Sequence, residues 1–100
     1  MPTIYRYLGM IFKFWSNEHN PVHVHVEYQD TSCTVYLHGT HGRIIVDVKN
    51  ASSGKRMDEK TLREVRKFAE KYKEKIMSKW TDYHVYGKKL KPEIITRRVH

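Results

Sequence analysis

Hydrophobic and polar residues alternate in short runs over the first half of the chain, residues 3–48. Alternation with a period of two is typical of β-strands that bury one face. In residues 22–28 the valines at even positions alternate with His23, His25 and Glu27. The pattern predicts that the valines contact the core and that the two histidines share the opposite, polar face of one strand.

Turn-forming residues divide this half of the chain into four or five strands. Glycine and short polar residues predict turns at residues 9–10, 29–31 and 39–42. Strands joined by short turns are typical of an antiparallel meander, which we expect over residues 1–49. The predicted strands cover residues 3–8, 11–15, 22–28, 33–38 and 44–48.

The second half begins with a polar connection and then takes on a helical pattern. Residues 50–57 are mostly small and polar, and residues 58–82 predict a helix with Asp58 as its N-cap and Glu59 in its first turn. Apolar side chains recur at spacings of three and four, so they form one stripe that packs on a sheet. The stripe comprises Leu62, Val65, Ala69, Tyr72, Ile76 and Trp80.

Residues 83–100 form a basic tail in which Leu90, Ile94, Ile95 and Val99 are apolar. These apolar residues predict either an additional edge strand or a segment that a partner orders. Residues 1–100 are therefore expected to form one α+β domain. We expect a four- or five-stranded antiparallel sheet covered by one long C-terminal helix and followed by the basic tail.

Two smaller groups of residues are expected in the core. Cys33 shares a strand face with apolar neighbours and is interpreted as a small buried hydrophobe. The aromatic residues of the first two strands could stack on bases, yet aromatic rows on a sheet more often belong to the core. This set comprises Tyr5, Tyr7, Phe12, Phe14 and Trp15.

The net charge of +8 lies entirely in the second half of the chain. Residues 1–54 hold four basic and four acidic side chains, whereas residues 55–100 hold fifteen basic and seven acidic ones. This asymmetry indicates a polyanion or an acidic protein as the partner of the second half. The alternative is a solvated surface that only keeps the domain soluble.

Cysteine usage and hydropathy restrict the compartment. The lone Cys33 cannot form an internal disulfide, and no segment has the pattern of a secretory signal. No apolar run approaches the ~18 residues of a membrane-spanning helix. We therefore expect a cytoplasmic protein with no membrane association.

The chain resembles a small bacterial family, the domain of unknown function 4160. The resemblance rests on Pro2-Thr3-Ile4 with Arg6 and Gly9, on residues 16–21 followed by residues 23–26, and more weakly on the helix with Trp80. Val22 stands where the family commonly repeats proline, and residues 36–50 and the last dozen do not align. His38, His41 and His100 therefore have no support from the family.

The resemblance implies a partner and little chemistry. Family members look like one half of two-gene bacterial cassettes that also encode a small partner protein. This suggests a toxin–antitoxin-like or regulatory pair. The family supplies no catalytic residues for this sequence.

The histidine-rich segment admits three interpretations. His23 and His25 project from one strand face with Cβ atoms ~7 Å apart, so with His19 or Glu27 they could ligate a metal ion. They could instead form hydrogen bonds on an ordinary polar sheet face. In the third interpretation they act as base and acid in a metal-independent, ribonuclease-like reaction, with Arg6 stabilising the developing charge.

The basic helix and tail are the candidate nucleic-acid-binding residues. Arg63, Lys67, Lys71 and Lys75 repeat at intervals of four away from the apolar stripe, and binding a polyanion would relieve their mutual repulsion. A solvated face, with ion pairs Glu59–Arg63, Glu64–Lys67 and Glu70–Lys73, is the alternative. The predicted binding set is Arg63, Lys67, Lys71, Lys88, Lys89 and Lys91.

The leading functional hypothesis is a basic module that binds nucleic acid, RNA in preference to DNA, and works with a small cognate partner protein. The first alternative is a non-catalytic adaptor or regulator whose basic half docks an acidic partner protein. The second is a small metal-binding domain built on His23 and His25, with His19 as a further ligand. No organic cofactor is expected.

Overall fold

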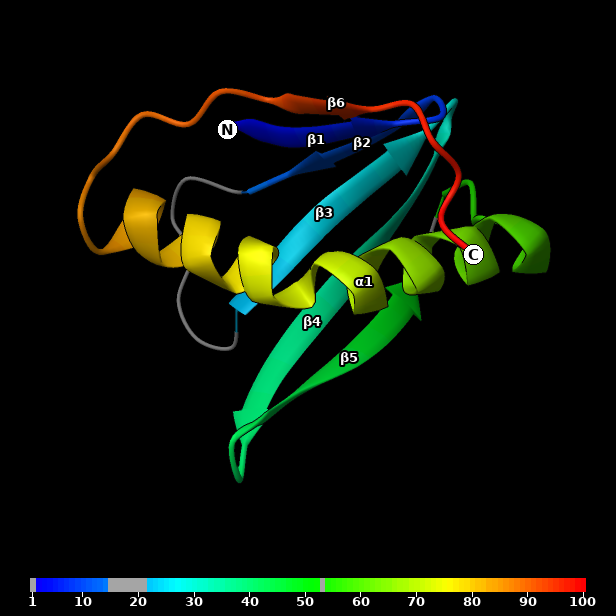
Figure 1. The fold of residues 1–100 in the computed structure, drawn as a ribbon. Coiled ribbons are helices and arrows are strands. Elements are labelled where there is room, and N and C mark those ends of the chain that lie inside the picture. The colour runs from blue at the N-terminus through cyan, green and yellow to red at the C-terminus, as the bar shows by residue number, and fades with distance from the viewer. Residues whose placement is uncertain (1, 15–21, 53) are drawn as a thin grey trace.

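The computed structural model describes residues 2–14, 22–52 and 54–100 (Figure 1). Within these ranges the chain forms six strands and one helix. The elements are β1 (Thr3–Tyr7), β2 (Met10–Lys13), β3 (Val22–Tyr28), β4 (Thr31–Thr40), β5 (Arg43–Asn50), α1 (Glu59–His84) and β6 (Glu93–Ile95). The strands form one sheet in the order β5-β4-β3-β2-β1-β6.

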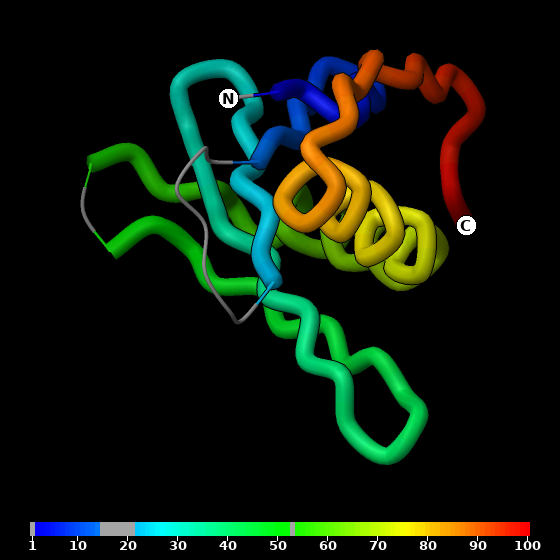
Figure 2. Tube along the Cα trace, turned by 90° about the vertical axis from the view of Figure 1, so that its left-hand side faces the viewer, coloured from blue at the N-terminus to red at the C-terminus, as the bar shows by residue number. Residues whose placement is uncertain are grey.

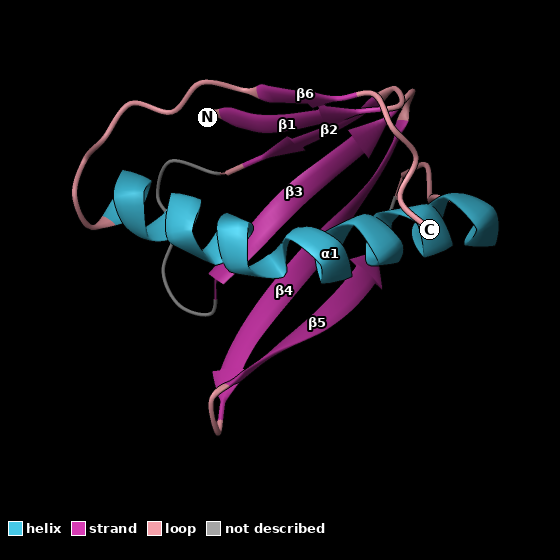
Figure 3. Ribbon diagram, in the orientation of Figure 1, coloured by secondary structure: helices cyan, strands magenta, loops and turns pink. Residues whose placement is uncertain are grey.

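The α+β architecture predicted from the sequence is confirmed. Helix α1 crosses one face of the twisted sheet, and the opposite face carries no helix in the described part of the chain (Figure 3). The helix ends two residues later than predicted, at His84. Asp58 is its N-cap, as expected, because its Oδ1 atom accepts a hydrogen bond of 2.8 Å from the backbone N–H of Thr61.

The hairpin turns are tighter than the sequence suggested. Leu8 and Gly9 both have positive φ, 48° and 87°, and His41 and Gly42 have 49° and 74°. Two successive positive φ angles are typical of the type I′ turn, whose twist matches that of the flanking strands. The predicted turn at residues 9–10 was therefore one residue late, because Met10 already belongs to β2 and is buried.

The basic tail adds a sixth strand to the sheet. β6 pairs in parallel with β1, whereas the other neighbouring strands pair antiparallel. After β6 the chain turns back to the helix, where it ends (Figure 2). Of the two alternatives for the tail, the edge strand is confirmed. The predicted meander of four or five strands corresponds to the five strands β1 to β5, and β6 is the added edge strand.

The core lies between the sheet and α1, and Phe68 is at its centre. Its ring centroid lies 5.2 Å from that of Tyr5, 4.5 Å from Tyr7 and 4.7 Å from Phe12. The aromatic residues of β1 and β2 are therefore core residues, together with Phe14, as expected. Trp15 lies outside the described residues. Phe68 itself was absent from the apolar stripe predicted for the helix.

Two further expectations concern burial and membranes. Cys33 is buried at 2% exposure, and burial raises the pKa of its thiol to about 12, so it is a core side chain and not a nucleophile. Among the described residues, no helix combines the length and the apolar character needed to cross a membrane.

Candidate nucleic-acid interface

The sheet face opposite α1 carries the predicted histidines. Val22, Val24 and Val26 of β3 are buried under the helix at 7% exposure or less. His23 and His25 alternate with them and are half-buried on the open face. The placement predicted from the period-two pattern is therefore confirmed.

His25 lies between two polar neighbours on the open face. In the strand register it is opposite Lys13 of β2 and Thr34 of β4. Burial is the main cause that lowers the pKa of His25, Glu27 opposes this effect, and Lys13 and His23 lower the pKa further. A lowered pKa favours the neutral imidazole, which can accept a proton but is a weaker base than an ordinary histidine.

His23 belongs to a row of three rings. Its ring centroid lies 5.3 Å from that of Tyr36, and Tyr36 stacks on His38 with centroids 6.3 Å apart. Tyr36 was not among the predicted site residues. Its alternation with the buried Val35 and Leu37 on β4 is the signal that places it beside His23.

Arg6 is not the cation nearest to the histidines. It pairs with Ile11 across β1 and β2, and Ile11 pairs with Glu27 of β3. Strand spacing and rise then place the Cα atoms of Arg6 and His25 about 12 Å apart. Lys13 is directly opposite His25, and its Nζ atom lies 2.7 Å from Glu27 Oε1. The structure thus brings Lys13, which was not among the predicted site residues, next to His25.

The alternative metal site used His19, His23 and His25. His19 lies outside the described residues, so this set of three ligands is not placed as a whole. In the ranges that the structure describes, no group of three His, Cys, Asp or Glu side chains could hold a metal ion.

A second candidate surface is a groove between α1 and the end of the tail. It has a volume of about 660 Å³. Its lining residues are Arg63, Arg66, Lys67, Glu70, Lys71, Val99 and His100. The structure therefore brings together three predicted nucleic-acid-binding residues of the helix. Arg66, which was not predicted to bind, joins them because it lies three residues from Arg63 on the same side of the helix.

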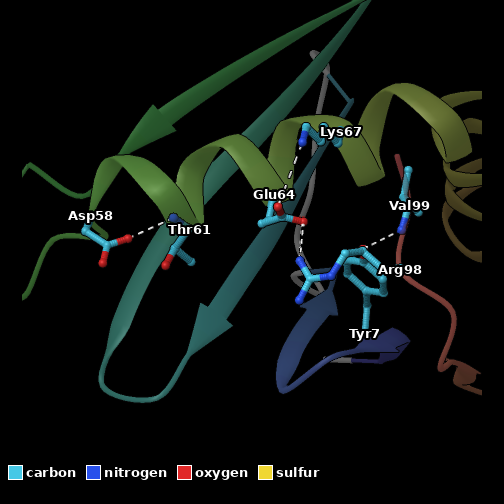
Figure 4. A network of polar contacts seen from close by, with 7 residues as sticks. All are labelled: Tyr7, Asp58, Thr61, Glu64, Lys67, Arg98 and Val99. Carbon is cyan, nitrogen blue, oxygen red and sulfur yellow. Dashed lines mark hydrogen bonds and ion pairs between the residues drawn. The ribbon is translucent and has the colours of Figure 1, made fainter.

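Two contacts hold the end of the tail as one wall of the groove, one to β1 and one to α1, and a third contact lies within the helix. The backbone N–H of Val99 donates a hydrogen bond of 2.8 Å to the hydroxyl of Tyr7. Arg98 Nη1 lies 3.1 Å from Glu64 Oε2, and Lys67 Nζ lies 4.0 Å from Glu64 Oε1 (Figure 4). Glu64 Oε2 is buried and has no hydrogen bond of its own, so its contact with Arg98 is chiefly electrostatic.

The groove is strongly positive. Among the described residues that line it, Glu70 has the one carboxylate side chain, and Glu70 Oε1 already lies 3.2 Å from Lys73 Nζ. In the described part of the chain, no carboxylate lies within ion-pair distance of Arg63, Arg66 or Lys71. Of the predicted ion pairs on the helix, Glu64–Lys67 and Glu70–Lys73 form, whereas Glu59–Arg63 does not.

Lys88, Lys89 and Lys91 lie elsewhere, in the connection between α1 and β6. Lys88 is 3.6 Å from Asp82 and lies over the ring of Tyr86, while Lys89 and Lys91 are exposed. The helix rises ~20 Å between Lys71 and its last residue. The predicted nucleic-acid-binding set therefore divides into a groove group and a connection group at different ends of the helix.

The groove and the histidines lie on different sides of the molecule. Arg63, Lys67 and Lys71 are exposed on the helix, whereas His23 and His25 are on the sheet face that the helix does not cover. A phosphate in the groove is thus separated from the imidazoles by the core. A nucleic acid would have to pass around the sheet edge to contact both surfaces.

Comparison with known proteins gives one match. The family described as "Domain of unknown function (DUF4160)" matches residues 9–81. That range includes β2 to β5, the histidine strand and most of α1. No curated protein and no solved structure matches the chain.

Proposed function

The chain belongs to the DUF4160 family, and we propose that it is a basic nucleic-acid-binding module that takes RNA in preference to DNA. We further propose that it forms one half of a bacterial toxin–antitoxin-like or regulatory two-gene pair with a small cognate partner. The observation that carries the proposal is the groove of four cations on the outer side of α1. The two-gene pair rests on the family resemblance, and the preference for RNA rests on the two histidines, which could serve as base and acid for attack by a 2′-hydroxyl.

The arrangement of the cations supports phosphate binding. Arg63, Lys67 and Lys71 follow one another at intervals of four residues, which spaces them ~6 Å apart along the helix. Like charges at this spacing repel one another, and a bound phosphate chain would remove that repulsion and release counterions. Arg63 and Arg66 add planar guanidinium groups, which can bind phosphate oxygens in a bidentate manner.

Cleavage of RNA, if the module performs it, belongs to the open sheet face. His23 and His25 share this face as the candidate acid and base, and burial favours the neutral form of His25 because it lowers the pKa. Lys13 is the neighbouring cation, and Arg6 is two strands away. We therefore assign phosphate binding to the groove and reserve the sheet face for any metal-independent chemistry.

The groove also fits the adaptor hypothesis, because an acidic peptide presents carboxylates to the same four cations. Charge alone does not separate the two ligands. The dependence of affinity on salt and on the chemical nature of the ligand does separate them.

The test is binding of single-stranded RNA, and of DNA of the same sequence, measured by fluorescence anisotropy over a range of salt concentrations. Three to five phosphate contacts give a log–log salt slope of roughly −2 to −3.5. The variant Arg63→Gln, Lys67→Gln, Lys71→Gln should lose about 2 from the magnitude of that slope. RNA should bind more tightly than DNA.

The matched control replaces three cations that lie outside both the groove and the helix, with the variant Lys49→Gln, Lys55→Gln, Arg56→Gln. It removes the same net charge and should weaken binding much less. Equal effects of the two triple variants would reject the groove as the site. Binding of an acidic peptide, with no binding of RNA or DNA at low salt, would replace this proposal with the adaptor.

A further inference from the structure

The two edges of the sheet differ in how they are protected. β6 has three residues and follows Pro92, so it offers little backbone to another strand. β5 has eight residues, contains no proline, and pairs with one neighbour only among the strands that the structure describes. A long edge strand without such protection is a surface for pairing with another strand.

Apolar side chains on β5 are also less buried than those of the inner strands. Ile44, Val46 and Val48 face the helix side of the sheet but are only half-buried, whereas the core residues of β3 and β4 are buried. Ile45, on the open face, is 50% exposed. Both faces of the sheet therefore present partly exposed β-branched residues along this edge.

We propose that two copies of the chain form a dimer through antiparallel pairing of β5 with β5, with the two-fold axis at Ile45. The proposal does not depend on nucleic-acid binding. The pairing would join the two sheets into one continuous sheet. A second copy fits this edge because the charges of β5 complement themselves.

The backbone restricts which residues can pair. Residues that flank a two-residue hairpin turn form a hydrogen-bonded pair, and Thr40 and Arg43 flank the turn between β4 and β5. The backbone N–H and C=O groups of successive residues in a strand point to opposite sides, so those of Arg43, Ile45 and Asp47 point towards β4. The groups of the even-numbered residues from 44 to 48 are directed towards the free edge. A symmetric pairing must therefore be centred on a residue and not between two residues.

The charges then select the centre. A pairing centred on Val46 places Arg43 opposite Lys49, and one centred on Asp47 places two aspartates opposite each other, so both are unfavourable. A pairing centred on Ile45 places Arg43 of each copy opposite Asp47 of the other copy, which gives two attractive pairs. In the described part of the chain neither Arg43 nor Asp47 has an ion-pair partner.

One other centre gives opposite charges but covers less apolar surface. Centring on Val48 pairs Asp47 with Lys49, but it leaves Ile44 and Ile45 beyond the paired residues. Centring on Ile45 instead pairs Ile44 with Val46 and the two Ile45 side chains with each other. The centre at Ile45 is thus the one that satisfies the backbone, the charges and the exposed isoleucines together.

Sedimentation equilibrium and light scattering test the dimer. The wild-type chain should show a concentration-dependent monomer–dimer equilibrium. Arg43→Glu or Asp47→Arg alone should raise the dimer dissociation constant about tenfold or more, because two attractive pairs become repulsive. The double variant should restore the dimer, which a merely unfolded protein could not do. Lys49→Glu should have little effect.

Cross-linking tests the position of the axis. Opposite residues of a non-hydrogen-bonded antiparallel pair have Cα atoms about 4.5 Å apart, within the range that a disulfide bridges. Ile45→Cys should therefore form a covalent dimer on oxidation. Ile94→Cys, at the more exposed isoleucine of β6 (70%), is the control and should remain monomeric. The native Cys33 is buried and should not interfere.

Three results would overturn the proposal. A protein that stays monomeric up to its solubility limit would reject the dimer. A dimer that Lys49→Glu disrupts and Arg43→Glu does not would place the axis at Val48. A dimer that cross-links through Ile94→Cys and not through Ile45→Cys would place the interface at β6.

Discussion

The backbone N–H of Val99 donates a hydrogen bond of 2.8 Å to the hydroxyl oxygen of Tyr7, 92 residues earlier in the chain. Both residues are buried, so neither group can exchange this bond for water. The bond fixes the end of the tail against β1, and the same segment of the tail forms one wall of the cationic groove. The order of the groove thus depends on a contact inside the core.

Replacing Tyr7 with Phe tests this dependence. The change retains the ring that packs on Phe68 but leaves the N–H of Val99 without its acceptor, which should cost about 1–3 kcal/mol of unfolding free energy. Amide hydrogen exchange of Val99 should accelerate more than exchange in β3. Urea unfolding and residue-resolved exchange measure the two effects. Unchanged exchange at Val99 would show that other contacts hold the tail.

Phe68 supplies the second prediction. Phe68→Ala removes a ring that contacts Tyr5, Tyr7 and Phe12, so it should destabilise the fold by about 3–5 kcal/mol in urea unfolding. Leu62→Ala, at a half-buried position of the same helix, is the control and should cost clearly less. A similar loss for both variants would mean that Phe68 is not the centre of the core.

Strong local patterns explain why much of the fold was predictable. The period of two in β3 and the period of about 3.6 in α1 each reflect a single buried face, and Asp58 adds a local capping signal. β6 was predicted only as one of two alternatives for the tail, because three residues carry too little pattern to decide between them. Its position depends on β1, which is far away in the sequence. Phe68 was missed because the predicted stripe contains about one apolar residue per helical turn. Phe68 is adjacent to Ala69 of that stripe and makes the apolar face wider than predicted.

The candidate site was only partly predictable, for a related reason. Arg63, Lys67 and Lys71 recur at intervals of four, so the helical period alone places them on one side of α1. Whether the tail returns to that helix depends on the bond between Val99 and Tyr7, which no local pattern encodes. The register of β2 and β3 likewise decides that Lys13, and not Arg6, neighbours the histidines.

His25 gives a prediction about pH. Its pKa is lowered in the folded state, chiefly by burial, below the ordinary value of 6.5. Between these two values the unfolded chain binds more protons, so the contribution of His25 to stability is complete above pH 6.5 and decreases as the pH falls towards the folded-state pKa. We expect His25→Gln to reduce the loss of stability between neutral and mildly acidic pH.

Urea unfolding at a series of pH values, with His23→Gln as the control, measures this effect. Each variant removes one imidazole from the same strand, so the comparison isolates the contribution of His25, whose pKa is lowered by burial. An identical pH dependence in His25→Gln and in the wild-type protein would contradict the assignment.

The last prediction concerns the two groups of cations that the structure separates. The helix rises ~20 Å between Lys71 and its last residue, and Lys88, Lys89 and Lys91 lie beyond that residue. A short RNA of about four nucleotides that occupies the groove should not reach them, whereas a strand of about sixteen nucleotides can contact both groups.

Replacing Lys88, Lys89 and Lys91 with Gln should therefore leave the affinity and salt slope for the short RNA unchanged. For the long RNA the same variant should lose up to about 2 from the magnitude of the salt slope, because each lost contact to a single strand removes about 0.7. Fluorescence anisotropy with both RNAs measures the difference. Equal losses for the short and the long RNA would mean that the primary site is the connection between α1 and β6 and not the groove.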